Sequence, residues 1–195
     1  VPAQYTLQAE IEIMDRLGIS GSFLIDVLSP KRLQSRVFEL AGLPERTIFD
    51  ERGKCMVLSA LIEEDKEQLT VYRGAAENAA NGFTERVSNI IASLKRSELT
   101  AEEVLLAAEK MGEGNTAAEK LKDIGRIYAA YEQRMAGELA DAEDISREMC
   151  MRFERSGVLK GQHIFVYGFD MITPTFAAQM LSMAPLCESL TLAVE

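Results

Sequence analysis

The clearest candidate site is a short run of residues, 162–174, with the pattern of a strand followed by a helix start. Its first part, 163–167, is β-branched and aromatic and predicts a buried strand, which Gly168 ends. Thr173 then fits an N-cap and Pro174 a first helical residue. Parallel-sheet proteins usually hold ligands just beyond the carboxyl end of a strand, so this loop is where binding chemistry is expected.

Other side chains that could do chemistry have simpler structural explanations. His163, the single histidine, lies inside the expected strand without a histidine or cysteine partner, which favours a structural role. Asp141, Glu143 and Asp144 stand at an expected helix start, where the macrodipole favours negative charge, so capping is favoured over metal binding. The three cysteines form no CxxC pair, which favours unreactive thiols over a metal or catalytic role. We therefore expect neither a catalytic constellation nor a metal site.

Composition narrows the function further. The 195 residues include 21 Lys and Arg against 31 Asp and Glu, a net charge of −10, which argues against free-standing non-specific nucleic-acid binding. No G-x-x-x-x-G-K-[S/T] motif is present, so the chain cannot form a P-loop by itself. No apolar run approaches the ~18 residues that span a bilayer, and no signal peptide opens the chain, which predicts a cytoplasmic protein without a membrane partner. The Val1-Pro2 start, without a methionine, indicates an excerpt from a longer chain.

The elements that position the candidate loop begin at the amino terminus. We expect a helix capped by Thr6 and ended by Gly18, a strand over 23–28, and a helix beginning at Ser29-Pro30. The apolar face of the first helix comprises Leu7, Ile11 and Met14. A strand followed directly by a helix is compatible with a parallel sheet.

The middle of the chain, 47–157, has helical periodicity and no strand pattern, and it predicts a block of about five helices. Thr100 and Glu103 form a capping box within it. Lys95 and Arg96 are expected to be ordinary charges on a helix face.

The carboxyl-terminal part returns to strand, helix and strand, the last strand over 190–194. We therefore expect a predominantly helical α/β protein. Its domains are a partial P-loop-NTPase-like parallel sheet from 1–46 and 158–195, and an inserted all-helical subdomain, 47–157.

Several ordered motifs together resemble one family, and the resemblance covers nearly the whole chain. They are Gln4-Tyr5-Thr6, the 27–37 segment with Arg32-Leu33 and Arg36-Val37, Leu94-Lys95-Arg96, the 120–128 series, Asp141-Ala142-Glu143-Asp144-Ile145, and Val166-Tyr167-Gly168-Phe169 with Thr173-Pro174. This set is similar to the amino-terminal, helicase-like region of the B subunits (AddB/RexB type) of ATP-dependent helicase/nucleases.

The resemblance implies a UvrD-like superfamily-one fold whose motor is degraded. Active relatives end the strand equivalent to 163–167 in an Asp-Glu pair that holds magnesium and activates water for ATP hydrolysis. Tyr167 and Gly168 stand at these positions, and the B subunits commonly have Asp-Gly-Phe there, so Tyr167 departs from that pattern as well. No cofactor is therefore expected in this chain. The iron–sulfur cluster, magnesium and ATP of the parent family are expected elsewhere in the protein.

The resemblance also implies a DNA-binding site. Family positions implicated in recognising the Chi recombination hotspot match Gln4, Thr6, Arg32 and Phe169. Gln and Arg can read base edges, Thr can bond a base or phosphate, and Phe offers a stacking face. The alternative is that these residues have only structural roles: Thr6 caps a helix, Arg32 is an exposed first-turn charge and Phe169 is a core residue. Two positions that can be aromatic in the family are Pro30 and Ser35 here, so the target sequence stays open.

The expected function is thus a non-catalytic, DNA-handling part of a helicase/nuclease subunit in double-strand break repair. It would guide single-stranded DNA, recognise a Chi-like hotspot and bind the AddA-type (RexA-type) partner of the helicase/nuclease. A helical protein-interaction module without nucleic-acid binding is the alternative, motivated by the charge of −10 and the long helical block. An active ATPase fragment is a third possibility, disfavoured by the altered nucleotide-hydrolysis motifs.

Overall fold

The computed structural model describes residues 1–74, 82–112 and 114–193. It is predominantly helical and contains two small parallel sheets, as the α/β prediction expected. The chain forms two compact units, residues 1–44 with 146–195 and residues 45–145. Because compactness alone does not define a domain, the expected boundaries after residues 46 and 157 stay a prediction.

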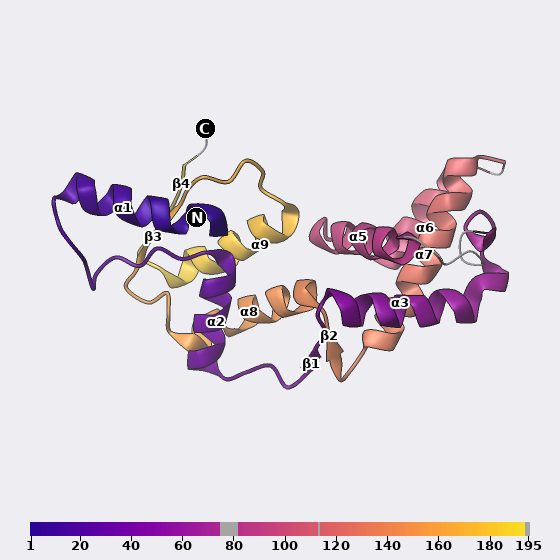
Figure 1. Ribbon diagram of the computed structural model, residues 1–195, viewed down its shortest axis with the longest axis horizontal. Coiled ribbons are helices and arrows are strands. Elements are labelled where there is room, and N and C mark those ends of the chain that lie inside the picture. Colours follow the sequence, from indigo (N-terminus) through magenta and orange to yellow (C-terminus); the bar gives the residue numbers. More distant parts are fainter. Residues whose placement is uncertain (75–81, 113, 194–195) are drawn as a thin grey trace. The chain divides into compact units, whose positions relative to one another are not determined.

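The first unit contains the candidate loop and the elements around it (Figure 1). They are η1 (Ala3–Tyr5), α1 (Thr6–Leu17), α2 (Pro30–Ala41), β3 (His163–Val166), α9 (Pro174–Met183), η3 (Ala184–Leu186), β4 (Ser189–Leu192) and most of α8 (Ala142–Ser156). β3 and β4 pair in parallel, with His163 opposite Ser189 and Val166 opposite Leu192. The loop after β3 and the segment after β4 therefore both begin at the same end of the sheet, at the carboxyl ends of the two strands.

Local sequence signals set three helix ends in this unit. The Ser29 side chain accepts a hydrogen bond from the Arg32 backbone N–H at the start of α2, and Thr173 does the same for Phe176 at the start of α9. α1 ends at Gly18, whose φ of 64° lies in the left-handed region, as predicted. The predicted Thr6 cap is wrong: Tyr5 occupies the N-cap position, and the Thr6 hydroxyl donates back to the Ala3 carbonyl.

Two strand predictions in this unit need correction. The 23–28 segment forms no strand, and Phe23 and Leu24 are fully exposed. A hydrophobic run becomes a strand only where a neighbour accepts and donates its backbone hydrogen bonds, and sequence alone does not show that neighbour. β3 forms as predicted but is not buried, since Phe165 is 70% exposed and only Val166 is buried.

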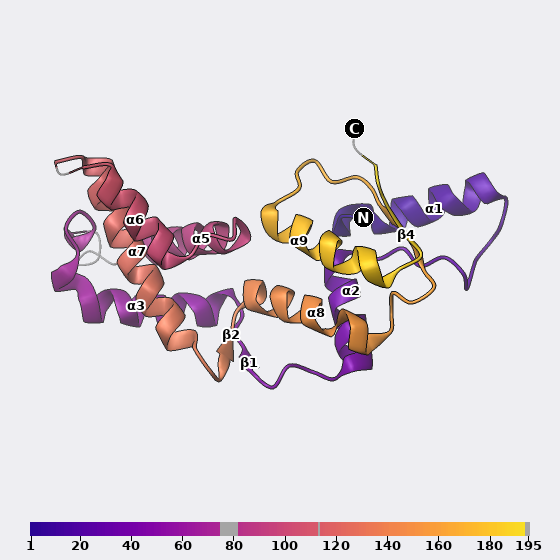
Figure 2. The same ribbon diagram turned by 180° about the vertical axis from the view of Figure 1, so that it is seen from behind.

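The second unit has a helical core, and the predicted helices of this block are present. They are α3 (Glu51–Asp65), α5 (Phe83–Arg96), α6 (Ala101–Lys110), α7 (Thr116–Met135) and the first turn of α8, with the short η2 (Lys66–Gln68) after α3. Figure 2 shows α6 and α7 running side by side, where Gly125 of α7 lets the Leu105 side chain approach closely. Its core residues are Leu58, Leu61, Ile62, Leu69, Phe83, Val87, Ile91, Ile124, Ile127, Tyr128, Tyr131 and Met135.

This unit is not all-helical, so that part of the prediction is wrong. β1 (Thr47–Ile48) pairs in parallel with β2 (Leu139–Ala140), joining the segments where the chain enters and leaves the unit. Two residues are too few to show the alternation by which a strand is found in a sequence.

Lys95 also departs from its prediction, because it is buried rather than solvated. Its Nζ lies 2.8 Å from Asp141 Oδ2, 2.7 Å from Asp144 Oδ1 and 3.2 Å from Glu132 Oε1. The Tyr131 hydroxyl donates to the same Asp141 oxygen at 3.0 Å. The Asp141 Oδ1 atom accepts the Asp144 backbone N–H, so the predicted capping of α8 is confirmed, within a buried ion cluster.

This cluster gives the stability of the chain an acid dependence. Burial alone would raise the pKa of Asp141, but the charge and hydrogen bond of Lys95 outweigh it and lower the pKa to about 2. Because the folded pKa lies below the ordinary value, Asp141 stabilises the fold above about pH 4 and loses this contribution as the pH falls toward 2. We expect the urea midpoint to drop less between about pH 5 and pH 3 in Asp141→Asn than in wild type. An equal drop in both proteins would contradict this assignment.

Candidate nucleic-acid interface

A cleft of about 510 Å³ lies in the first unit, at the carboxyl ends of β3 and β4. Its lining residues come from η1 and α1, from the loop after β3, and from the end of β4. They are Tyr5, Gln8, Ala9, Glu12, Tyr167, Gly168, Phe169, Asp170, Ile172, Leu192 and Ala193. The cleft lies beyond the carboxyl end of β3, where the sequence predicts that a ligand is held, and that it holds one stays a prediction.

Gly168, in the loop after β3, lies beside the amino-terminal segment of the chain. Its φ of 77° lies in the left-handed region, and a Cβ there would stand 3.5 Å from Pro2 Cδ and 3.9 Å from Tyr5 Cδ2. These are ordinary van der Waals distances, so the backbone conformation, and not a lack of space, is what favours glycine here. The Val1 amino group donates to the Leu28 carbonyl at 3.0 Å, which holds the same segment beside the residues that lead into α2.

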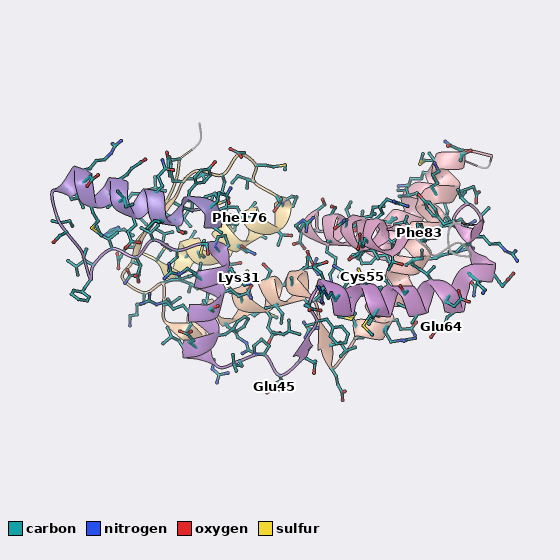
Figure 3. All side chains as sticks on the ribbon, in the orientation of Figure 1. Lys31, Glu45, Cys55, Glu64, Phe83 and Phe176 are labelled. Carbon is teal, nitrogen blue, oxygen red and sulfur yellow. The ribbon has the colours of Figure 1, made fainter. Side chains whose placement is uncertain are left out.

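Of the four predicted recognition residues, Phe169 lines the cleft. It is partly buried, and its ring packs against Phe176 of α9 with the centroids 4.6 Å apart. Figure 3 marks Phe176 on α9 and Lys31, the neighbour of Arg32, in the first turn of α2. Phe169 is thus supported from one side while it borders the cleft.

The other three residues do not line the cleft. Gln4 is exposed and Thr6 is partly buried, on either side of Tyr5. Arg32 is exposed in the first turn of α2, and its side chain is available to a ligand. That these residues recognise one DNA strand together stays a prediction.

The residues at the end of β3 do not fit a catalytic magnesium ion. Tyr167 offers a phenol and Gly168 no side chain, whereas Mg²⁺ in nucleotide-hydrolysing sites is held through carboxylates. Within the ranges that the structure describes, no three His, Cys, Asp or Glu side chains gather as a metal site would require. We therefore assign no hydrolytic role to the residues at the end of β3.

The residues of η1 and α1 that line the cleft were not among the site residues predicted from the sequence. Tyr5, Gln8 and Glu12 follow one another at spacings of three and four, so they share one side of a helix. On the apolar face predicted for this helix, the Leu7 and Ile11 side chains are 69% and 52% exposed. The spacing alone shows that Tyr5, Gln8 and Glu12 share one side. Nothing in the sequence shows that this side meets the loop after β3.

Comparison with known proteins decides the family. A family model described as "ADDB, N-terminal" matches residues 1–195. The chain belongs to the AddB amino-terminal family. Three similar curated proteins each carry the name of the B subunit of an ATP-dependent helicase/deoxyribonuclease. Those of Alkaliphilus metalliredigens and Moorella thermoacetica are 29% and 30% identical over 98% and 97% of this chain. That of Bacillus velezensis is 33% identical over 89% of it.

This AddB-family chain spans only about a sixth of its curated relatives, with 16%, 17% and 15% of their lengths covered in the three cases above. The names of those relatives describe one component of a DNA-processing complex. Among the helices in the described part of the chain, none is both long enough and apolar enough to cross a bilayer.

Proposed function

We propose that this chain is a non-catalytic, DNA-handling part of an ATP-dependent helicase/nuclease subunit that acts in double-strand break repair. In this proposal it guides single-stranded DNA past the carboxyl ends of β3 and β4 and recognises a short Chi-like sequence. The observation that carries it is the cleft, where Phe169 and the segment around Gln4 and Thr6 meet in a chain of the AddB amino-terminal family.

The proposal assigns each side chain a role that suits its position. Phe169, held by Phe176, offers an aromatic edge or face to a base. Arg32 is exposed at a helix start and can bond a phosphate or a guanine edge. Gln4 is exposed beside the cleft and has both an amide donor and an acceptor for base edges.

In this proposal, other parts of the complex carry out ATP hydrolysis and DNA cleavage. The parallel sheet is part of a P-loop-NTPase-like, UvrD-like motor that has lost its hydrolytic acids at Tyr167 and Gly168. ATP, magnesium and the iron–sulfur cluster are bound by other parts of the complex. The helical unit, whose expected role is protein contact, docks to the AddA-type partner or to another domain.

Titration of labelled single-stranded DNA tests this function. We expect salt-sensitive binding that Phe169→Ala weakens by about 1–3 kcal/mol, the usual value of one base stack. Arg32→Ala should weaken binding and reduce the dependence on log salt by about one if it contacts a phosphate. The controls are Phe165→Ala, an exposed aromatic that does not line the cleft, and Arg52→Ala, an exposed arginine in the first turn of α3.

Two results would contradict the proposal. One is robust ATP hydrolysis or nuclease activity by the chain itself. The other is equal loss of DNA affinity in the cleft variants and their controls.

A second candidate is a protein-interaction module without nucleic-acid binding. The net charge of −10 and the carboxylates of Glu12 and Asp170 in the cleft favour it, because both oppose phosphate binding. This candidate predicts no salt-sensitive DNA signal from the chain or from a longer protein that contains it.

A further inference from the structure

The charge of the cleft limits what it can hold. Its lining includes two carboxylates, Glu12 and Asp170, and no lysine or arginine. A phosphate group placed there would meet negative charge without a cationic partner. The cleft therefore suits an uncharged, hydrogen-bond-donating part of a ligand rather than a nucleotide phosphate.

The cleft also has aromatic walls. Tyr5 and Tyr167 line it and are 42% and 45% exposed, so each ring retains a free surface. Phe169 adds a third ring, which Phe176 fixes in place. Aromatic side chains beside a single-stranded nucleic acid commonly stack on its bases, whatever the base is.

One of the two carboxylates in the cleft, that of Glu12, is hydrogen-bonded to a neighbour. The Gln8 Nε2 atom donates to Glu12 Oε1 at 3.0 Å, one helical turn away. An ionised carboxylate accepts hydrogen bonds and donates none, so it selects bases by the donors on their edges. Guanine presents two adjacent donors, N1–H and N2–H, that match the two oxygens of one carboxylate. Adenine and cytosine place an acceptor beside their single amino group, and thymine has one N–H between two carbonyls.

We propose that this cleft binds one unstacked guanine of a single-stranded DNA, with Glu12 or Asp170 on its Watson–Crick edge and a tyrosine ring on its face. This inference rests on the proposed DNA-handling function and adds a base preference and residues outside the predicted recognition set. The strand's phosphates lie outside the acidic cleft, away from its two carboxylates.

The test uses the 195-residue chain and labelled oligonucleotides of about 12 nucleotides, within the range that such sites cover. One probe is oligo(dT), and the others carry a single central guanine, cytosine or adenine. We expect the guanine probe to bind at least about fivefold tighter than oligo(dT), the lower end for one specific base contact. In the double variant Glu12→Gln/Asp170→Asn this preference should fall below about twofold, while oligo(dT) binds equally well or better because two negative charges are gone.

Two further variants separate the roles. Tyr5→Leu should weaken the guanine probe and oligo(dT) by similar factors, because stacking does not discriminate between bases. The matched control is Glu10→Gln/Glu39→Gln, which removes two exposed carboxylates of the same unit that do not line the cleft. It should keep the guanine preference. Circular dichroism checks that every variant is folded.

The outcomes are distinguishable. If oligonucleotides bind without a guanine preference, or if the preference survives in the double variant, the inference is wrong and the proposed function stands. If no probe binds to the chain or to a longer protein that contains it, both are wrong.

Discussion

Replacing Lys95 with methionine is expected to destabilise the chain by about 3–5 kcal/mol, because it leaves buried carboxylates without their main cationic partner. Lys95 is fully buried and lies within 3 Å of oxygens of Asp141 and Asp144. Lys54 remains nearby, but its Nζ is 3.7 Å from Asp141 Oδ2 and also pairs with Glu143 at 3.3 Å. It cannot replace the hydrogen bonds that Lys95 donates.

The measurement is urea unfolding followed by circular dichroism, with Arg96→Met as the matched control. Arg96 is the next residue on α5 and pairs with Glu143 at 3.0 Å, but its side chain is 46% exposed. An exposed pair of this kind contributes at most about 1 kcal/mol. The double variant Lys95→Met/Asp141→Asn should recover part of the loss, since it removes a charge together with its partner. Equal effects of the two single substitutions would show that burial of Lys95 does not matter.

Replacing Asp123 with alanine is expected to cost about 3 kcal/mol or more, because it leaves several backbone donors without an acceptor. The Asp123 carboxylate accepts from the backbone N–H groups of Thr70, Val71 and Tyr72 at 2.8 to 3.1 Å. Asp123 is fully buried on α7, so its oxygens fix the chain just after η2. In the alanine variant, water would have to enter a closed core to replace the lost carboxylate oxygens.

Asp123→Asn distinguishes this role from simple packing. Asparagine has nearly the same size but keeps one oxygen acceptor and adds an NH₂ group that faces backbone donors. We therefore expect this variant to be destabilised by more than about 1 kcal/mol, although less than the alanine variant. Hydrogen exchange should rise first at the amides of residues 70–72. If the Asp123→Asn variant were as stable as wild type, the carboxylate would not be the feature that holds this segment.

The sequence predicted those parts of the fold that depend on neighbouring residues. Ser29-Pro30, Thr173-Pro174 and the Thr100–Glu103 capping box each act within one helical turn, and all three begin helices as predicted. The predicted resemblance to the AddB family is confirmed. It could be recognised from the sequence because the order of motifs along a chain needs no three-dimensional information.

The parts it did not predict depend on distant partners. Lys95 looked solvated because Asp141, its partner, lies 46 residues away. The 23–28 segment has the composition of a strand, but a strand also needs a paired neighbour. The acidic, aromatic cleft forms where α1 meets the loop after β3, and only the fold brings Glu12 and Asp170 to one surface.

Photo-crosslinking would show whether single-stranded DNA passes the carboxyl ends of β3 and β4. A photoreactive thymine analogue is placed at successive positions in a short oligonucleotide, and crosslinked peptides are identified by mass spectrometry. We expect crosslinks at Tyr5, at Tyr167 or Phe169, and near Arg32, and we expect Phe169→Ala to remove those in the loop after β3. Crosslinks confined to the helical unit, residues 45–145, would contradict this path of the strand.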